Sequence, residues 1–151
     1  MSVNYKESAK RHFDDAVHLE SAGGLSLGNS SQLLGISVEC GLKAILVGLG
    51  VPTKPDGGVQ NTKTFGHLPA LGQEFVAFAH GNGGAKYVSS LISTTTSQPL
   101  VSFAAWGVHT RYHNNSWHGS NISAMVVADQ RTDAQRCLQT LQQAILDGVV
   151  V

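Results

Sequence analysis

The sequence predicts an all-α protein, an up-and-down bundle of four to five helices that forms one domain over residues 1–151. Apolar residues recur at intervals of three and four in several long segments, which places them on one face of a helix. Clusters of glycine separate these segments. The alternation of apolar and polar residues that is typical of a half-buried strand appears over no useful length, so no significant sheet is expected.

The first helix is predicted to follow Asn4, because Asn4 and Glu7 have the spacing of a capping box. Gly23-Gly24 ends its apolar repeat. The residues of the expected core face are Tyr5, Ala9, Phe13, Ala16 and Val17. The charged residues of this segment lie off that face, so the helix is expected to be amphipathic with one side in solvent.

The second helix is predicted to run from Asn29, which again has capping spacing to Gln32, to about Leu49. Apolar residues surround most of its circumference, which indicates a helix at the centre of the fold. Its polar line consists of Gln32, Glu39 and Lys43. Glu39 precedes Lys43 by four residues, the favourable order for an ion pair along a helix.

Three glycines, Gly35, Gly41 and Gly48, lie inside this second helix. Each lowers helix propensity by about 1 kcal/mol relative to Ala. A residue type that destabilises the helix is expected where a side chain would be in the way. The glycines therefore indicate close approach by a neighbouring helix.

Three further helices are predicted in the second half of the chain. The third carries Leu68, Leu71, Phe75 and Phe78 and ends at the Gly81-Asn82-Gly83-Gly84 break. The fourth is short and carries Tyr87, Val88, Leu91 and Ile92, and Thr94 to Pro99 is expected to be loop. The last begins near Ser123, has a core face of Val127, Ala134, Leu138, Leu141 and Ile145, and ends with Gly148 as its carboxyl-terminal cap.

The connection from Gly50 to Gly66 is long for a compact domain, and such a loop is either functional or mobile. Its Gly57-Gly58 and Lys63-Thr64 have some of the residues of a phosphate-binding loop. No strand leads into it, and no glycine directly precedes the lysine, so we reject a phosphate loop.

The composition bounds the partners of the protein. Charged residues make up only 13% of the chain and hydrophobic residues 42%. A weakly charged surface indicates that another subunit covers part of it, and we expect a homodimer with two-fold symmetry. The formal net charge is zero, so the domain is not a basic nucleic-acid clamp, and any contact with nucleic acid is expected to be local.

The sequence also predicts a soluble, cytoplasmic protein. Cys40 and Cys137 fall within apolar helical patterns, where they are expected to be buried hydrophobes in a reducing compartment. The amino terminus is polar and has no apolar run behind it, so no secretory signal is expected. The longest apolar run, Ala44 to Val51, is too short to span a membrane.

The segment from Phe103 to His118 concentrates most of the possible chemistry of the chain. It contains Trp106, His109, Arg111, Tyr112, His113, Trp117 and His118. Buried aromatic rings fix a segment in place, arginine binds anions with a planar fork, and histidine carries protons near neutral pH. If the protein has an active or binding site, we expect it here.

The second helix and this segment together resemble a known family. Glu39 to Ala44 form a Glu-Cys-x-Leu-Lys-Ala run, His67-Leu68 opens the next helix, and Arg111-Tyr112 precedes the final helix. In this order the pieces are similar to HEPN domains (higher eukaryotes and prokaryotes nucleotide-binding), over about Tyr5 to Leu146. The resemblance implies an all-α bundle that is usually dimeric.

Active HEPN proteins are metal-independent endoribonucleases in which an arginine is followed, after four to six residues, by a histidine. Arg111 and His118 fit the upper limit of that spacing. The resemblance implies that the histidine moves a proton at the ribose 2′-hydroxyl or the leaving oxygen, and that the guanidinium grips the phosphate. It implies no metal and no cofactor, and it implies a composite site where two protomers face each other.

The resemblance also suggests residues that bind. Tyr112, His113 and Asn114 would line the cleft, and Glu39 and Lys43 belong to the similar run on the second helix. The catalytic HEPN pattern carries a polar residue directly after the arginine, whereas this sequence has Tyr112 there and His113 one step later. This departure bears on the catalytic assignment more than on the fold.

Other interpretations of the same residues stay open. Arg111 could cap a helix or pair with Glu39, and His118 could be a surface histidine. Trp106 and Tyr112 could be core anchors or a platform on which bases stack. The histidines at 109, 113 and 118 could bind zinc, although the segment has no acidic residue to orient them.

Two functions follow as hypotheses. The first is a HEPN-type endoribonuclease, for which a role as the toxin of a defence system or toxin–antitoxin pair, with a cognate antitoxin, is one option. The second is a catalytically silent HEPN-like dimer that binds a nucleotide or another protein, in which Arg111 would be buried and paired.

Overall fold

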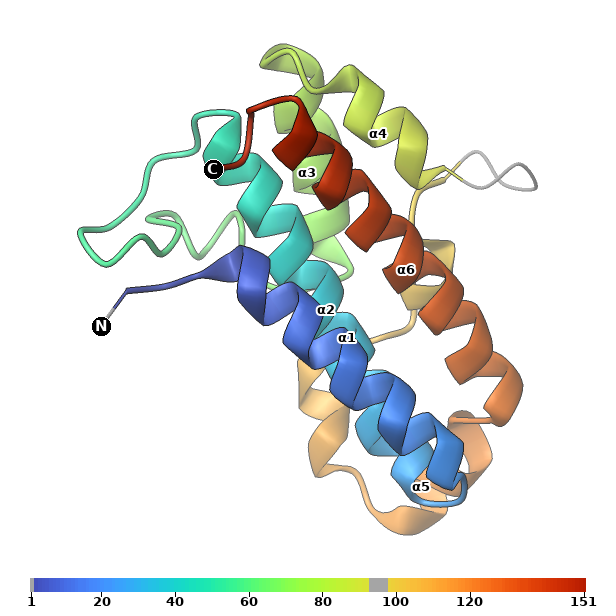
Figure 1. Ribbon diagram of the computed structural model, residues 1–151. Coiled ribbons are helices and arrows are strands. Elements are labelled where there is room, and N and C mark those ends of the chain that lie inside the picture. Colours follow the sequence, from blue (N-terminus) through green and yellow to red (C-terminus); the bar gives the residue numbers. More distant parts are fainter. Residues whose placement is uncertain (1, 93–97) are drawn as a thin grey trace.

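A computed structural model describes residues 2–92 and 98–151, and within these residues it confirms the predicted all-α helical bundle (Figure 1). The described residues contain helices and turns, two isolated β-bridges and no strand. The elements are α1 (Tyr5–Ala22), α2 (Ser26–Gly48), α3 (Ala70–Gly81), α4 (Ala85–Leu91), the 3-10 helices η1 (Val101–Phe103) and η2 (Val108–Tyr112), α5 (Asn115–Asn121) and α6 (Ala124–Leu146). The short helix α5 and the two 3-10 helices were not predicted.

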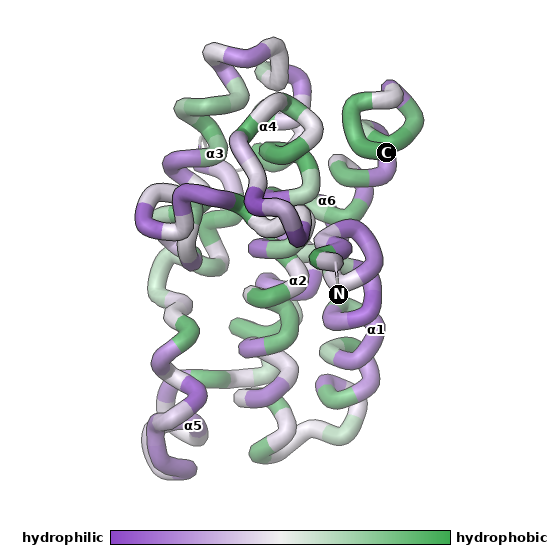
Figure 2. The backbone as a smooth tube through the Cα atoms, turned by 90° about the vertical axis from the view of Figure 1, so that its left-hand side faces the viewer, coloured by the Kyte–Doolittle hydropathy of each residue, from purple (hydrophilic) through white to green (hydrophobic). Residues whose placement is uncertain are grey.

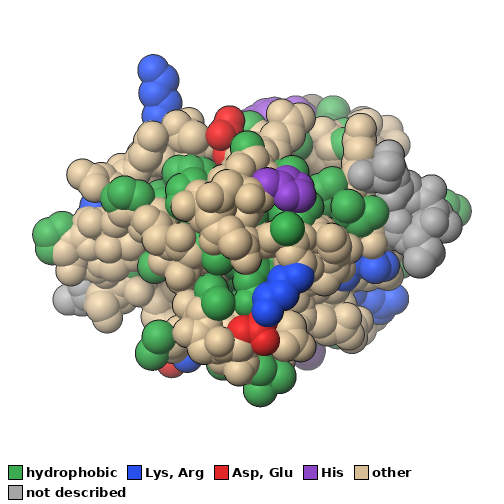
Figure 3. Space-filling view, turned by 90° about the horizontal axis from the view of Figure 1, so that it is seen from above, with side chains coloured by type: hydrophobic (Ala, Val, Ile, Leu, Met, Phe, Trp, Pro, Cys, Tyr) green, Lys and Arg blue, Asp and Glu red, His purple; other side chains and the backbone are tan. Residues whose placement is uncertain are grey.

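The three long helices α1, α2 and α6 form the body of the bundle. In Figure 1, α3 and α4 lie at the end of the molecule where α2 and α6 finish, and α5 lies at the opposite end. Seen from the end with α3 and α4, the charged side chains are scattered among hydrophobic and uncharged polar ones (Figure 3). This surface agrees with the low charge content of the chain.

Helix α1 packs antiparallel to α2 through two buried serine hydroxyls. Ser37 Oγ donates a hydrogen bond to the carbonyl oxygen of Ala9 over 2.7 Å, and Ser30 Oγ donates to that of Ala16 over 2.7 Å. Ala9 and Ala16 are both completely buried, and their small side chains leave room for this close approach. In Figure 2, hydrophilic and hydrophobic residues alternate along the turns of α1, as the predicted amphipathic pattern requires.

Helix α6 runs parallel to α2. Ser31 Oγ of α2 donates to Gln130 Oε1 of α6 over 2.6 Å, and one heptad further along, Cys137 Sγ lies 3.9 Å from the carbonyl oxygen of Val38. The alternation of an up-and-down bundle therefore applies to α1 and α2, whereas α6 repeats the direction of α2. The segment between α2 and α6 brings the chain back to the starting end.

The predicted first and last helices have the expected ends. Asn4 Oδ1 accepts a hydrogen bond from the Glu7 backbone N–H over 3.0 Å, and Ser123 Oγ accepts one from that of Val126 over 3.2 Å. At the other end of α6, Gly148 has a φ of 75°, as predicted for the residue that ends the helix.

The predicted start of the second helix is wrong. Helix α2 begins at Ser26, so Asn29 and Gln32 lie inside it rather than at its amino terminus. Gly23 and Gly24 have φ values of 64° and 56°. This left-handed backbone turns the chain tightly enough for α2 to start directly after the turn, ahead of the residues that have the capping spacing.

The glycines of α2 make space, as predicted, although a helix is the neighbour at one position only. A Cβ at Gly41 would come within 2.9 Å of Cys137 Sγ on α6. At Gly35 the neighbour is the indole of Trp106, and at Gly48 it is the backbone of Val149 after the end of α6.

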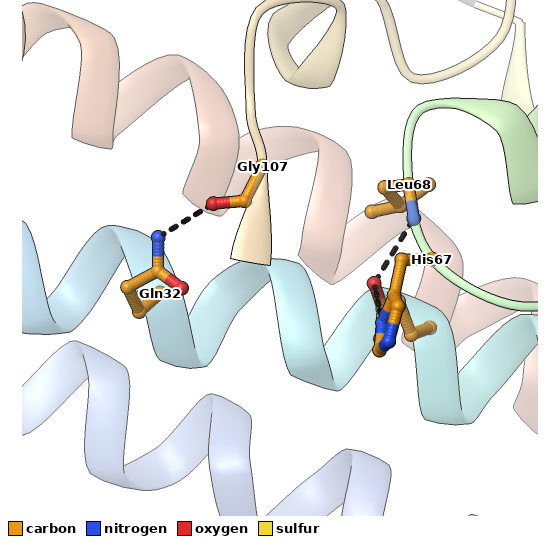
Figure 4. Close-up of polar contacts among 5 residues, drawn as sticks. Gln32, His67, Leu68 and Gly107 are labelled. Atoms are coloured by element: carbon orange, nitrogen blue, oxygen red, sulfur yellow. Dashed lines mark hydrogen bonds and ion pairs between the residues drawn. The ribbon is translucent and has the colours of Figure 1, made fainter. Parts of the chain in front are cut away.

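Partners of α2 repeat at intervals of seven residues. Ser30 and Ser37 contact α1, and Ser31 and Val38 contact α6. Gly28 and Gly35 face His118 and Trp106, while Gln32 and Glu39 bind two different loops (Figure 4). Seven residues are close to two helical turns, so each pair lies on one side of the helix. Helix α2 is therefore in contact with other parts of the chain on several sides.

Among the described residues, α2 is also the one helix long and apolar enough to cross a membrane. Within the bundle, 67% of the 18-residue apolar stretch of α2 is buried against the rest of the chain. This burial places α2 in the core of the bundle.

The connection from 50 to 66 packs on the bundle. Val51 and Val59 are buried, and the Val59 backbone N–H donates to the Tyr5 hydroxyl over 3.0 Å. Within the loop predicted from Thr94 to Pro99, residues 94–97 lie outside the described residues.

Candidate functional site

The segment with most of the possible chemistry is held against α2 by side chains that carry no charge. Trp106 Nε1 donates to the carbonyl oxygen of Ser31 over 3.0 Å. Gln32 Nε2 donates to the carbonyl oxygen of Gly107 over 3.1 Å (Figure 4). The same amide nitrogen also donates to Thr110 Oγ1 over 2.6 Å. Both attachments are buried, so they position η2 firmly on the bundle.

Aromatic and imidazole rings form a continuous row across η2 and α5, which we call the ring row. Its members are His109, His113, Trp117 and His118. Successive ring centroids lie 5.8 Å, 4.3 Å and 5.3 Å apart. The His113–Trp117 and Trp117–His118 pairs meet edge to face, an arrangement that aromatic rings prefer.

Local sequence explains why the row forms. Asn114 caps α5, because its Oδ1 accepts a hydrogen bond from the Trp117 backbone N–H over 2.9 Å. The cap starts the helix at Asn115, which brings Trp117 back against His113. Asn114, predicted to line a cleft, therefore has a structural part in placing the rings.

Arg111 and Tyr112 lie between His109 and His113 in the chain, and both are exposed. The guanidinium carbon of Arg111 lies 4.8 Å from the centroid of the Tyr112 ring, and Tyr112 is 77% exposed. The interpretation of Tyr112 as a core anchor is wrong, whereas that of Trp106 is confirmed, since Trp106 is 6% exposed. Tyr112 is the last residue of η2, and its side chain is exposed, whereas the Trp106 indole fills the space that a Cβ at Gly35 would take.

The alternative pairing of Arg111 with Glu39 is wrong as well. The buried Glu39 carboxylate accepts hydrogen bonds from the backbone N–H of Leu68 over 3.0 Å and lies 3.1 Å from His67 Nδ1 (Figure 4). These partners hold the chain at the entrance to α3. Lys43 lies one turn further along α2, half-buried, and no contact joins it to the ring row in the described structure. Glu39 and Lys43 therefore stand apart from the ring row.

His118 ends the ring row in a different environment from Arg111. Its Nδ1 is buried and has no hydrogen-bond partner among the described residues, and a Cβ at Gly28 would come within 2.6 Å of it. The ring lines a cavity of about 390 Å³ together with Gly28 and Ile122. Arg111 does not line this cavity, and no contact in the described part of the chain joins Arg111 to His118.

The zinc alternative has no geometric support. Within residues 2–92 and 98–151, no group of three or more His, Cys, Asp or Glu side chains is placed to hold a metal ion. His109, His113 and His118 are threaded along the ring row with Trp117 between the last two, so they do not converge on one point.

The part of the chain that contains the ring row has no acidic residue. No Asp or Glu occurs between Glu74 and Asp129. Arg111 therefore has no carboxylate on its own segment to neutralise it. This leaves a local positive charge on a chain whose net charge is zero.

The two thiols are unsuited to nucleophilic chemistry. Burial raises the pKa of the Cys137 thiol to about 12, and burial also raises the pKa of the Cys40 thiol to about 11. Thiols with such pKa values stay protonated at neutral pH. Cys137 is the buried hydrophobe that its helical pattern predicts, and Cys40 is half-buried.

Sequence reasoning missed the residues that place the segment. Ser31, Gln32 and Thr110 form its polar attachments, and Gly28 makes room for His118. A usable signal was present, because Gln32 and Glu39 are seven residues apart in an otherwise apolar helix. Polar residues on one side of a buried helix indicate polar partners there.

No protein-family model, curated protein or solved structure matches this chain. The resemblance to HEPN domains therefore depends on the quoted residues alone. The class that fold and site define is an α-helical bundle with an exposed Arg–Tyr pair beside a row of rings.

Proposed function

We propose that this protein binds single-stranded RNA through Arg111, Tyr112 and the ring row. The observation that carries the proposal is the exposed Arg111–Tyr112 stack, which lies between two members of the ring row in the chain, on a segment without acidic residues. An exposed tyrosine ring offers a flat face on which the base of an unpaired nucleotide can stack. A base that stacks on Tyr112 would cover it.

The chemistry of the two side chains suits a nucleotide. Stacking a base on an aromatic side chain is worth about 1–3 kcal/mol. The guanidinium of Arg111 offers a planar fork that matches a phosphate in two parallel hydrogen bonds. Together they would hold one base and one phosphate of a strand whose bases are unpaired.

The net charge of zero favours binding by stacking over binding by charge. A single-stranded ligand releases counterions in proportion to the phosphates that the protein neutralises, with a slope of about −0.7 per phosphate. With Arg111 as the main cation, the logarithm of the affinity should fall with the logarithm of the salt concentration with a slope of about −1 or shallower.

Fluorescence anisotropy with short single-stranded RNA tests the proposal. Arg111→Ala and Tyr112→Ala should each weaken binding by about tenfold, the equivalent of roughly 1.4 kcal/mol. Arg11→Ala, which removes an exposed arginine on α1, is the matched control and should bind as the wild type does. Wild-type affinity in both Arg111→Ala and Tyr112→Ala would disprove the proposal.

A second candidate is metal-independent endoribonuclease activity, as the resemblance to HEPN domains implies. The observation in its favour is the buried His118 Nδ1, which has no partner among the described residues. No contact in the described chain joins Arg111 to His118, so the two would have to meet across a homodimer. The imidazole would then move the proton at the ribose 2′-hydroxyl while Arg111 holds the phosphate.

Cleavage assays in EDTA separate the two candidates. A ribonuclease of this kind leaves 2′,3′-cyclic phosphate ends, and His118→Ala should slow it by about 100-fold to 10,000-fold with little change in RNA binding. His80→Ala, at the exposed end of α3, is the control. Intact RNA after incubation with a wild-type protein that binds it would leave binding without catalysis.

The proposal extends to the setting of the protein. We place it in the cytoplasm as a homodimer that acts as a toxin or defence component with a cognate antitoxin, or as a silent module that binds a nucleotide or another protein. Sedimentation of the purified protein tests the dimer. Co-purification from its native cells tests for a partner protein.

A further inference from the structure

A second feature, separate from the exposed Arg111–Tyr112 pair, is a cavity that adjoins the ring row at Trp117. This open cavity of about 290 Å³ is lined by residues of α2, η1, η2, α5 and α6. Both tryptophans of the chain, Trp106 and Trp117, line it. Trp117 is also a member of the ring row, so the cavity and the ring row share a side chain.

The lining of this cavity carries no charge. Besides the two indoles and small apolar side chains, it has hydroxyl and amide groups from five residues: Ser31, Ser102, Thr110, Asn121 and Gln130. A phosphate would lose its hydration there without any cation to replace it. The lining therefore fits an uncharged ligand that is flat enough to lie against an indole.

Several of these polar groups are already satisfied within the protein. Ser31 Oγ donates to Gln130 Oε1 over 2.6 Å, and Gln130 Nε2 reaches the carbonyl oxygen of Ser102 over a long 3.4 Å. Asn121 Nδ2 donates to the carbonyl oxygen of Trp117 over 2.9 Å.

Other groups are left for a ligand. Among the described residues, the Trp117 indole N–H and Asn121 Oδ1 have no partner, and an amide nitrogen such as Gln130 Nε2 carries a second N–H. The cavity thus offers donors and an acceptor around a ring-lined space. The edges of nucleobases carry the same mixture of donors and acceptors.

We infer that this cavity is a binding site for a single uncharged nucleobase, with its ribose, held against Trp117. The inference builds on the proposed function, which supplies the class of ring. The volume of about 290 Å³ is just below the range of roughly 300–1,000 Å³ for small-molecule sites, so one ring system fits better than a longer piece of strand. The charged phosphates stay outside the cavity, because its lining offers no cation.

The two tryptophans make the site directly observable, because all tryptophan emission of the protein comes from side chains that line this cavity. We would titrate the purified protein with adenosine, guanosine, cytidine and uridine, and with ribose 5-phosphate as a charged ligand that lacks a base. At least one nucleoside should change the tryptophan emission in a saturable way. Ribose 5-phosphate should change nothing.

A variant that fills the cavity provides the decisive comparison. Ala105 is exposed and lines the cavity, so Ala105→Leu should narrow it without disturbing the core, and nucleoside affinity should fall tenfold or more. Ala85→Leu, an exposed alanine of α4 outside the cavity, should bind as the wild type does. Circular dichroism of both variants checks that they are folded.

The outcomes separate this inference from the proposed function. Nucleoside titrations without saturable change, or an unchanged affinity in Ala105→Leu, would overturn the nucleobase site even if RNA still bound through Arg111 and Tyr112. Saturable nucleoside binding that Ala105→Leu abolishes would establish the site even if Arg111→Ala left RNA binding intact.

Discussion

The indole of Trp106 occupies the space that a side chain at Gly35 would need. A Cβ built at Gly35 would overlap the ring atoms of Trp106, whose N–H meanwhile donates to the carbonyl oxygen of Ser31 one turn earlier on α2. The absence of a side chain at Gly35 therefore makes room for one of the two tryptophans of the candidate segment. The first prediction follows from this fit.

Gly35→Ala should destabilise the protein by about 1–3 kcal/mol, because the added methyl group forces the Trp106 ring out of place. Helix propensity alone predicts the opposite sign, a gain of about 1 kcal/mol. Gly72→Ala in α3 is the control, since its Cβ would meet only an ordinary contact of 3.9 Å. Urea unfolding measures both, and a Gly35→Ala variant as stable as the wild type would show that the fit is loose.

Gln32→Ala should release η2 from α2. The substitution removes the donor to Thr110 Oγ1 and to the carbonyl oxygen of Gly107, both buried, at a cost of about 1–3 kcal/mol. Hydrogen exchange at residues 107–113 should become faster, and RNA affinity should fall although Gln32 itself is buried. Gln135→Ala, an exposed glutamine on α6, should change neither. Unchanged exchange in Gln32→Ala would contradict the attachment.

Asp147→Asn should lower stability in a pH-dependent way. Hydrogen bonds from Lys86, Tyr87 and Gln143 lower the pKa of the Asp147 carboxyl from 3.8 to about 2. A carboxyl whose pKa is lower in the folded state stabilises the fold above its unfolded pKa, and this contribution is lost as the pH falls through the folded value. The difference in Tm between wild type and variant should therefore be complete above pH 4 and disappear towards pH 2.

Asp129→Asn is the control for this pH dependence, because Asp129 is an exposed carboxyl of α6 that makes no hydrogen bond within the described residues. Its Tm should follow that of the wild type over the whole range. A difference for Asp147→Asn that persists unchanged at pH 2 would show that the effect comes from packing rather than from charge.

Both thiols should resist alkylation in the folded protein. With a pKa of about 11, the Cys40 thiol is ionised at pH 8 in roughly one molecule in a thousand. Cys137, with a pKa of about 12, is ionised less and is also buried. Mass spectrometry after iodoacetamide treatment should find neither thiol modified without denaturant and both modified in guanidinium. Rapid labelling of Cys137 in native buffer would show that α2 and α6 separate.

The sequence predicts the ends of α1 and α6 well because their caps are local. Asn4 and Ser123 bond backbone groups three residues away, so a short pattern contains all the information. The start of α2 depends instead on the left-handed backbone at Gly23 and Gly24, and the capping spacing at Asn29 gave a false signal. Helix α5 was missed because it is short and has no buried face.

The sequence singles out the segment that carries the candidate site, but it does not give the directions of the side chains. Trp106 and Tyr112 are both aromatic and only six residues apart, yet one is buried over Gly35 and the other is exposed. Which ring turns inward depends on a glycine far away in the chain. Likewise, Glu39 bonds the chain at Leu68 rather than Arg111, since the fold brings that backbone N–H to it.

The repeat of partners at seven residues along α2 limits how the protein can change over evolutionary time. Inserting or deleting one residue in α2 would rotate everything beyond it by about 100° and misplace serine, glycine and amide contacts on several sides at once. The length of α2 is therefore fixed more tightly than its composition. Segment 103–121 depends on the same spacing, because Trp106 lies over Gly35 and Gln32 bonds Thr110. A change in the length of α2 would therefore displace the candidate site together with the core.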